Sequence, residues 1–206
     1  MDAIVAFRHA LKWFKHKVLS LSPNSQLQCP QGHRLALCRW SIDCLDESNV
    51  QQVSPNNMFD VFKKAFALPM FEEFVSHSHE ELAIVLFYNL GLAHHLAGLT
   101  PGSADTKQHL HRAQRFYEIS FSLLCSAEVL KFDSSSNTLM LGLVANMGHI
   151  YSHYWKMDDA MSCQTRLSEL LDSGALVGLT EEEQSFFFST LATGEAAHKI
   201  FLAPAA

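Results

Sequence analysis

A run without any charged side chain, residues 82–99, restricts most strongly what this chain can fold into. It is apolar on nearly every side of a helix, and we predict a helix over 79–97 that ends at Gly98 and is mostly buried. The run is just long enough to cross a membrane. However, Asn89, His94 and His95 lie inside it and no cluster of Lys or Arg flanks it, so a buried core helix is the better interpretation.

Apolar residues spaced by three and four predict further helices along the rest of the chain. Their expected ranges are 2–21, 55–68, 105–130, 138–155, 160–171 and 181–199. Thr180 and Glu183 form a capping box that should open the last of them. Residues 34–45 fit either a short strand pair or another packed helix, and the periodicity does not decide. Apart from these residues, the pattern is typical of an all-α protein.

The N-terminal part differs in charge from the rest, and we predict an extension at 1–50 followed by a helical domain at 51–206. Residues 1–42 carry six basic side chains and one acid, whereas the whole chain has a net charge of −6. In the expected amphipathic helix at 2–21, Arg8, Lys12 and Lys15 lie mainly opposite the apolar stripe. Three interpretations stay open: a cover for one end of the domain, a contact with an anionic membrane surface or acidic partner groove, or part of an organelle transit peptide.

An internal echo is the most informative feature of the sequence. Asn89-Leu90-Gly91 is repeated as Asn146-Met147-Gly148, and a long helical stretch follows each copy. In the second copy, Gly148, Tyr151 and Ala160 have the three- and twelve-residue offsets of a tetratricopeptide repeat, which this unit resembles closely. The first copy is a stretched version, because its glycine and the matching alanine lie 22 positions apart. The resemblance covers roughly residues 80–171.

This resemblance implies antiparallel helix-turn-helix repeats stacked as a short right-handed α-solenoid, with the helices at 55–68 and 181–199 as degenerate layers. It also implies a non-catalytic scaffold that binds a peptide or helix of a partner protein in its inner groove. Asn89, Asn146, His149 and His153 are the candidate partner-binding residues on the groove side. The alternative for the asparagines is that they only brace the inner helices through backbone hydrogen bonds.

A metal-binding helical protein is the alternative function, because the chain has twelve histidines and a cysteine-containing N-terminal segment. Cys29, His33, Cys38 and Cys44 are possible zinc ligands, although they lack paired C-x2-C spacing. His149 and His153 lack the glutamate of an H-E-x-x-H motif. We find no nucleophile elbow, phosphate-binding loop or dinucleotide fingerprint, and we expect neither an enzyme nor a cofactor or metal.

The charge and the cysteines bear on the partner and the compartment. A net charge of −6 makes nucleic acid an unexpected partner, so another protein is predicted. The five cysteines show no disulfide framework, which favours reduced thiols and an intracellular, cytoplasmic location. Import into an organelle through the basic N-terminus stays open, and the pattern does not predict an oligomeric state.

Overall fold

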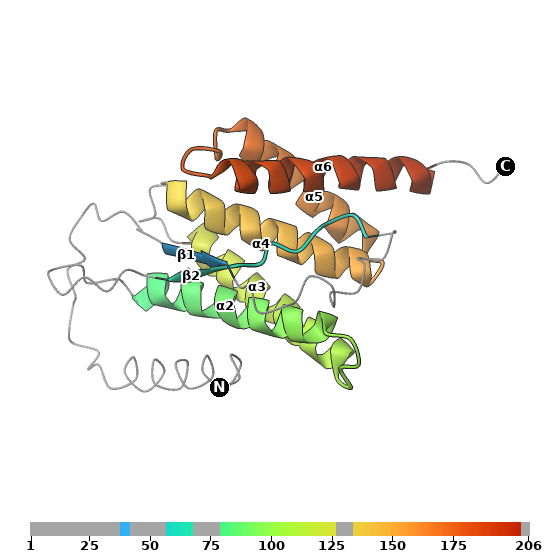
Figure 1. The fold of residues 1–206 in the computed structure, drawn as a ribbon, viewed down its shortest axis with the longest axis horizontal. Helices are drawn as coiled ribbons and strands as arrows, with labels where there is room; N and C mark the ends of the chain where they lie inside the picture. Colours follow the sequence, from blue (N-terminus) through green and yellow to red (C-terminus); the bar gives the residue numbers. More distant parts are fainter. Residues whose placement is uncertain (1–37, 42–56, 68–78, 127–133, 203–206) are drawn as a thin grey trace, which may run out of the picture.

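A computed structural model describes residues 38–41, 57–67, 79–126 and 134–202, which form five helices and a two-stranded sheet (Figure 1). The described part of the chain is therefore mostly helical, as the sequence predicts. The helices are α2 (His79–Leu99), α3 (Thr106–Ser126), α4 (Ser134–His153), α5 (Met157–Asp172) and α6 (Glu181–Leu202), and the strands are β1 (Cys38–Ser41) and β2 (Lys64–Ala67).

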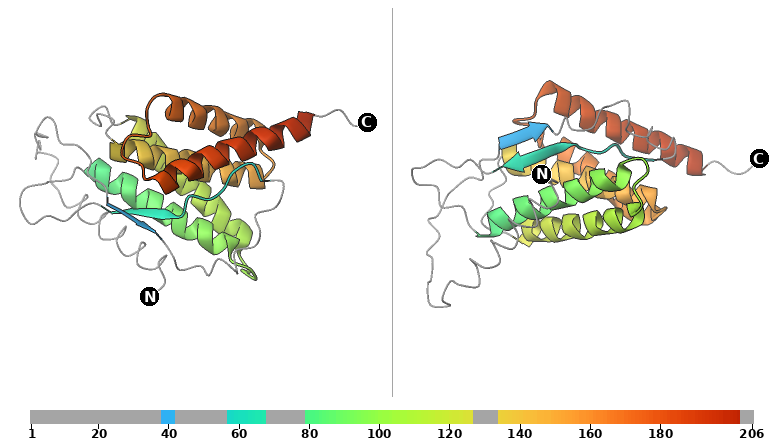
Figure 2. Two further views of the ribbon diagram at one scale, coloured as in Figure 1. Left: turned by 45° about the horizontal axis from the view of Figure 1, so that its top comes forward. Right: turned by 60° about the horizontal axis from the view of Figure 1, so that its bottom comes forward.

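The helices form two layers. The helix α3 packs mainly on α2, and α5 packs mainly on α4, so that consecutive helices make two hairpins. Figures 1 and 2 show α2, α4 and α6 side by side in one layer, with α3 and α5 behind them. The segment that ends in β2 crosses the open side of the first layer, in front of α4 and between α2 and α6 (Figure 1).

The most enclosed helix is α4, because every residue from 138 to 150 is buried. It contacts α3, α5 and α6, and the crossing segment covers its remaining side. The helix α2, which the sequence predicts to be mostly buried, is less enclosed and leaves Leu82, Leu86 and Phe87 partly exposed. Among the described helices, α2 alone is long and apolar enough to cross a membrane, but 67% of its apolar stretch is buried inside the structure.

The predicted helix at 55–68 is wrong: its described residues, 57–67, are extended. We call residues 57–67 the strap. Its large apolar side chains have helical spacing, yet all of them are buried by the helices that they cross: Met58, Phe59, Val61, Phe62 and Phe66. Tertiary contacts have therefore overridden a local pattern that suited a helix.

The undecided segment at 34–45 contains a strand. Residues Cys38–Ser41 form β1, which pairs antiparallel with β2 so that Cys38 lies opposite Ala67 and Ser41 opposite Lys64. A piece of the predicted extension thus adds a strand to the strap. The predicted N-terminal helix with Arg8, Lys12 and Lys15, and the possible zinc ligands Cys29, His33 and Cys44, lie outside the described residues.

The helix termini confirm one capping prediction and correct another. At the start of α6, the Thr180 hydroxyl accepts from the Glu183 N–H at 3.2 Å, and the Glu183 carboxylate accepts from the Thr180 N–H at 2.8 Å. This is the expected capping box. In contrast, Gly98 does not end α2 in a left-handed conformation but lies inside the helix. A Cβ atom there would come within 2.9 Å of the Leu110 side chain, so this glycine allows α2 and α3 to approach.

Glycines on α4 make room for the strap. A Cβ atom at Gly148 would lie 2.6 Å from the Phe59 ring, and one at Gly142 would lie 2.8 Å from the Phe62 ring. Gly148 of the echo thus accommodates an aromatic ring of the strap.

We predict that Gly148→Ala lowers the free energy of unfolding by about 1–3 kcal/mol, because the added methyl group must displace the buried Phe59 ring. In an ordinary helix interior, replacing glycine by alanine raises the free energy of unfolding by about 0.5–1 kcal/mol. Chemical denaturation measures the difference. The loss of unfolding free energy caused by Gly148→Ala should be smaller in a chain that already carries Phe59→Leu. A stabilising effect of Gly148→Ala alone would contradict the packing.

Candidate functional site

Two asparagines hold the backbone of the strap from neighbouring helices. The Asn89 side chain on α2 accepts from the Phe66 N–H at 3.0 Å and donates to the Phe66 carbonyl at 2.6 Å. The Asn146 side chain on α4 does the same with Phe62, at 2.8 and 3.2 Å. Each side-chain amide thus pairs with one residue's N–H and C=O, as a neighbouring strand would.

A third contact continues this pattern along the strap. The Ser152 hydroxyl on α4 accepts from the Met58 N–H at 3.0 Å. The backbone N–H groups of Met58, Phe62 and Phe66, each four residues from the next, are therefore bound by side chains of the helices. These bonds offset the cost of burying peptide groups outside regular secondary structure.

The aromatic rings of the strap fill recesses between the helices. The Phe62 ring lies 5.0 Å from the Phe187 ring and 5.4 Å from the Phe186 ring of α6, measured between centroids. The Phe66 ring meets Tyr88 of α2 edge-on, at 5.0 Å. The strap therefore contacts all three helices of the first layer.

One charged contact fastens the strap to the first turn of α6. The Lys64 Nζ lies 3.4 Å from Glu183 Oε1 and 3.8 Å from Glu182 Oε2. The Glu183 side chain is 1% exposed and the Lys64 side chain 17% exposed, whereas the Glu182 side chain is 83% exposed. Because the other Glu183 oxygen closes the capping box, this one residue links the strap to the start of α6.

Behind the strap, Asn146 joins a buried network of polar rings. Its Nδ2 lies 3.2 Å from the Tyr117 hydroxyl and 3.4 Å from that of Tyr88. The Tyr117 hydroxyl lies 3.4 Å from His95 Nδ1, and His95 Nε2 lies 3.0 Å from His149 Nδ1. The network thus runs from the strap through α2 and α3 to the far turns of α4.

Burial dominates the titration of this network. It raises the pKa of Tyr88 and Tyr117 well above the usual value, although the hydrogen bond to Asn146 opposes the shift. Burial, reinforced by the charge of His153, lowers the pKa of His149 to about 3. The pKa of His95 is also lowered well below its usual value, first by burial and then by His149 and His153. Both histidines are therefore neutral near pH 7.

The four predicted partner-binding residues divide into two pairs. Asn89 and Asn146 lie together on the face that holds the strap, and both bind backbone groups of the strap rather than those of the inner helices that the alternative interpretation named. His149 is buried against His95, while His153 is exposed beyond the end of this network. Sequence reasoning did not find Ser152, and it recognised Glu183 only as a capping residue.

Four histidines of the described chain meet in two pairs. His94 Nδ1 lies 2.9 Å from His109 Nδ1, in addition to the pair made by His95 and His149. Within the described ranges, no three side chains of His, Cys, Asp or Glu converge in a way that could hold a metal ion.

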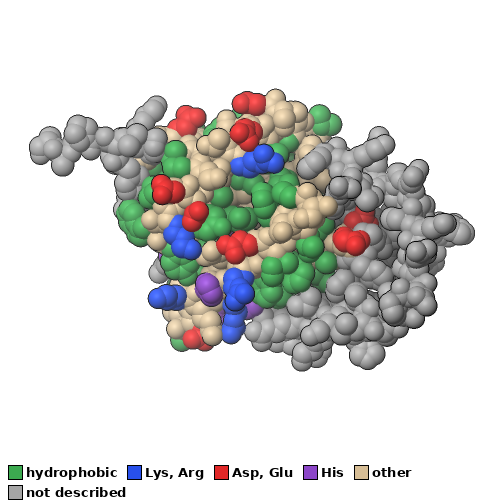
Figure 3. Space-filling model, turned by 180° about the vertical axis from the view of Figure 1, so that it is seen from behind, with side chains coloured by type: hydrophobic (Ala, Val, Ile, Leu, Met, Phe, Trp, Pro, Cys, Tyr) green, Lys and Arg blue, Asp and Glu red, His purple; other side chains and the backbone are tan. Residues whose placement is uncertain are grey.

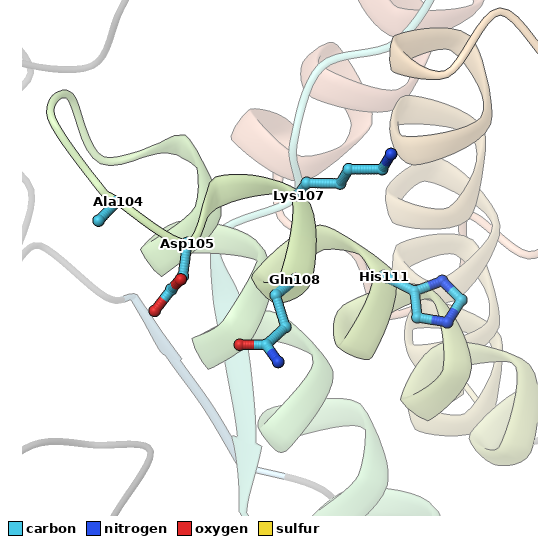
Figure 4. A pocket seen from close by; sticks show the side chains of 5 residues that line it. All are labelled: Ala104, Asp105, Lys107, Gln108 and His111. Carbon is cyan, nitrogen blue, oxygen red and sulfur yellow. The ribbon is translucent and has the colours of Figure 1, made fainter.

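An open depression lies at the start of α3, lined by exposed side chains that point in different directions (Figure 4): Ala104, Asp105, Lys107, Gln108 and His111. Its side chains do not converge on one point, and we assign no site to it.

On the side opposite the strap, hydrophobic side chains gather between charged side chains of both signs (Figure 3). The large hydrophobic residues that the described chain exposes belong to different elements: Ile119 to α3, Trp155 to the α4–α5 turn, Val177 to the α5–α6 connection and Phe188 to α6. Exposed hydrophobic residues scattered singly are normal on soluble proteins. The strap-binding face, with its paired backbone contacts, is therefore the candidate functional site.

We compared the chain with known proteins. No family model, no curated protein and no solved structure matches it.

We predict that Asn146→Ala lowers the free energy of unfolding by roughly 3 kcal/mol, because it leaves the buried Phe62 N–H and C=O without their partner. The exposed His153 provides the control, and His153→Ala should change stability by less than about 0.5 kcal/mol. Urea denaturation measures both. Equal costs for the two variants would show that Asn146 does not support the strap.

We also predict that acid destabilises the fold through His95 and His149. An unfolded histidine binds a proton below about pH 6.5, whereas the folded pKa of His149 is about 3 and that of His95 is also low. The unfolded state then binds more protons, so the free energy of unfolding falls as the pH is lowered from 6.5 towards 5, by up to about 1.4 kcal/mol per pH unit for each histidine.

Denaturation at several pH values measures this slope. His149→Asn should reduce it by about half, because one of the two groups no longer titrates. A stability that is constant between pH 6.5 and 5 would contradict the burial of neutral histidines.

Proposed function

We propose that the chain is a non-catalytic protein-interaction scaffold, a short right-handed solenoid of tetratricopeptide-like hairpins whose inner face binds an extended peptide. The hairpins α2–α3 and α4–α5, followed by α6, supply the layers that such a stack needs. Gly91 supports the likeness, because it leaves room for the Tyr117 ring of its own hairpin. The intracellular location and the protein partner predicted from the sequence belong to this proposal.

The paired contacts of Asn89 and Asn146 carry the proposal. They occupy the same place in the two copies of the echo, and both bind the backbone of an extended segment. Backbone contacts of this kind give affinity, while pockets for side chains give specificity. The face therefore has both parts of a peptide-binding groove.

In this structure the occupant is the chain's own strap. Met58, Phe59, Phe62 and Phe66 are each at most 2% exposed, and burying such a side chain contributes about 1.5–3 kcal/mol. The strap is also tethered, which gives it a high effective concentration at the face. A partner peptide must replace these contacts, so the strap acts as an internal competitor that keeps weak binders out.

A labelled peptide with the sequence of residues 57–67 tests the proposal, added to the full chain and to its Phe62→Leu variant. The variant weakens the strap by about 1 kcal/mol without removing a core side chain. Peptide binding, followed by fluorescence anisotropy, should therefore be about fivefold tighter to the variant than to the unchanged chain. A peptide bound elsewhere would bind both chains equally.

Two controls define the site. A scrambled peptide should not bind, and adding Asn146→Ala to the Phe62→Leu chain should abolish binding if circular dichroism shows the helices intact. The proposal is rejected if the folded Phe62→Leu chain binds the scrambled and ordered peptides alike, or binds neither.

A further inference from the structure

We infer that this face selects basic aromatic peptides, and specifically an extended partner segment of the pattern Phe-x-Lys/Arg-x-Phe. The inference rests on the proposed function and names the chemistry of its partner. In the strap the pattern corresponds to Phe62, Lys64 and Phe66, whose side chains all contact the helices of the first layer.

The basic position is set by a buried carboxylate. Glu183 is fixed by its capping box, so its Oε1 faces the strap whatever peptide lies there. Its side chain is 1% exposed, and a cation beside a buried carboxylate contributes more than one beside an exposed carboxylate. An occupant with a neutral or acidic residue at this position would leave the carboxylate without the cation that Lys64 supplies.

The surroundings extend this selection. Glu181 and Glu182 lie in the same first turn of α6, and both are exposed. They lie where a basic peptide would approach and an acidic one would be repelled. The acidic turn thus favours cationic segments before contact, and Glu183 selects among them after contact.

The flanking aromatic positions are set by the recesses in the helices. The rings of Phe186 and Phe187 surround Phe62, and Gly142 gives that ring space, since a Cβ atom there would lie 2.8 Å from it. The position of Phe66 is bounded by Tyr88 and by the backbone contacts of Asn89. Two aromatic residues four positions apart therefore fill the two recesses, and a basic residue between them pairs with Glu183.

The test compares three labelled peptides on the full-length Phe62→Leu chain: the strap sequence 57–67, the same sequence with Lys64→Gln, and the same sequence with Lys64→Glu. We expect about tenfold weaker binding for the Gln peptide and still weaker binding for the Glu peptide. When Glu183→Gln is added to the chain, the strap and Gln peptides should differ by less than about twofold. Glutamine can still close the capping box, so this variant removes the charge and keeps the helix start.

Glu195→Gln is the matched control, because it removes an exposed carboxylate from the same helix, away from its first turn. It should leave the ranking of the three peptides unchanged. Equal binding of all three peptides to the chain with Glu183 would overturn the inference and leave the proposed groove standing. If no peptide binds, the proposed function itself fails.

Light scattering on the same samples identifies the occupant. The chain should be monomeric at the concentrations of the assay, with and without peptide. A dimer that the strap peptide dissociates would assign the face to the strap of a second copy, and would overturn the assignment to a partner protein.

Discussion

The arrangement depends on the pairing of the Asn146 side chain with the backbone of Phe62. An extended segment cannot lie in a helical interior unless its peptide groups find partners, because each unpaired buried group costs about 1–3 kcal/mol. Asn146 supplies both partners at Phe62, and Asn89 repeats the solution at Phe66. With its backbone satisfied, the strap can bury aromatic side chains against α2, α4 and α6, which would otherwise present an open apolar face.

The same contacts connect stability to the proposed function. The glycines of α4 admit the rings of Phe59 and Phe62, and Glu183 joins the strap to the capping box of α6. Every feature that would bind a peptide from a partner therefore also holds the chain's own segment. In the proposed function, a partner peptide would replace the strap as the occupant of this face.

Much of the helical framework could be predicted from local chemistry. The charge-free run at 82–99 predicts a mostly buried helix, and Thr180 with Glu183 predicts a helix start that the structure confirms. The strap could not be predicted in this way, because its apolar residues have the spacing of an amphipathic helix. Its extended form depends on Asn89 and Asn146, which lie 23 and 84 positions away from the residues that they bind. The echo identified these asparagines, but not the segment that they hold.

Hydrogen–deuterium exchange at the amides of Phe62 and Phe66 tests the central claim most directly. If side-chain amides hold the strap against the helices, these two N–H groups should exchange about as slowly as those in the middle of α4, although they belong to no helix. Fast exchange of both amides under conditions that keep α4 protected would contradict the account.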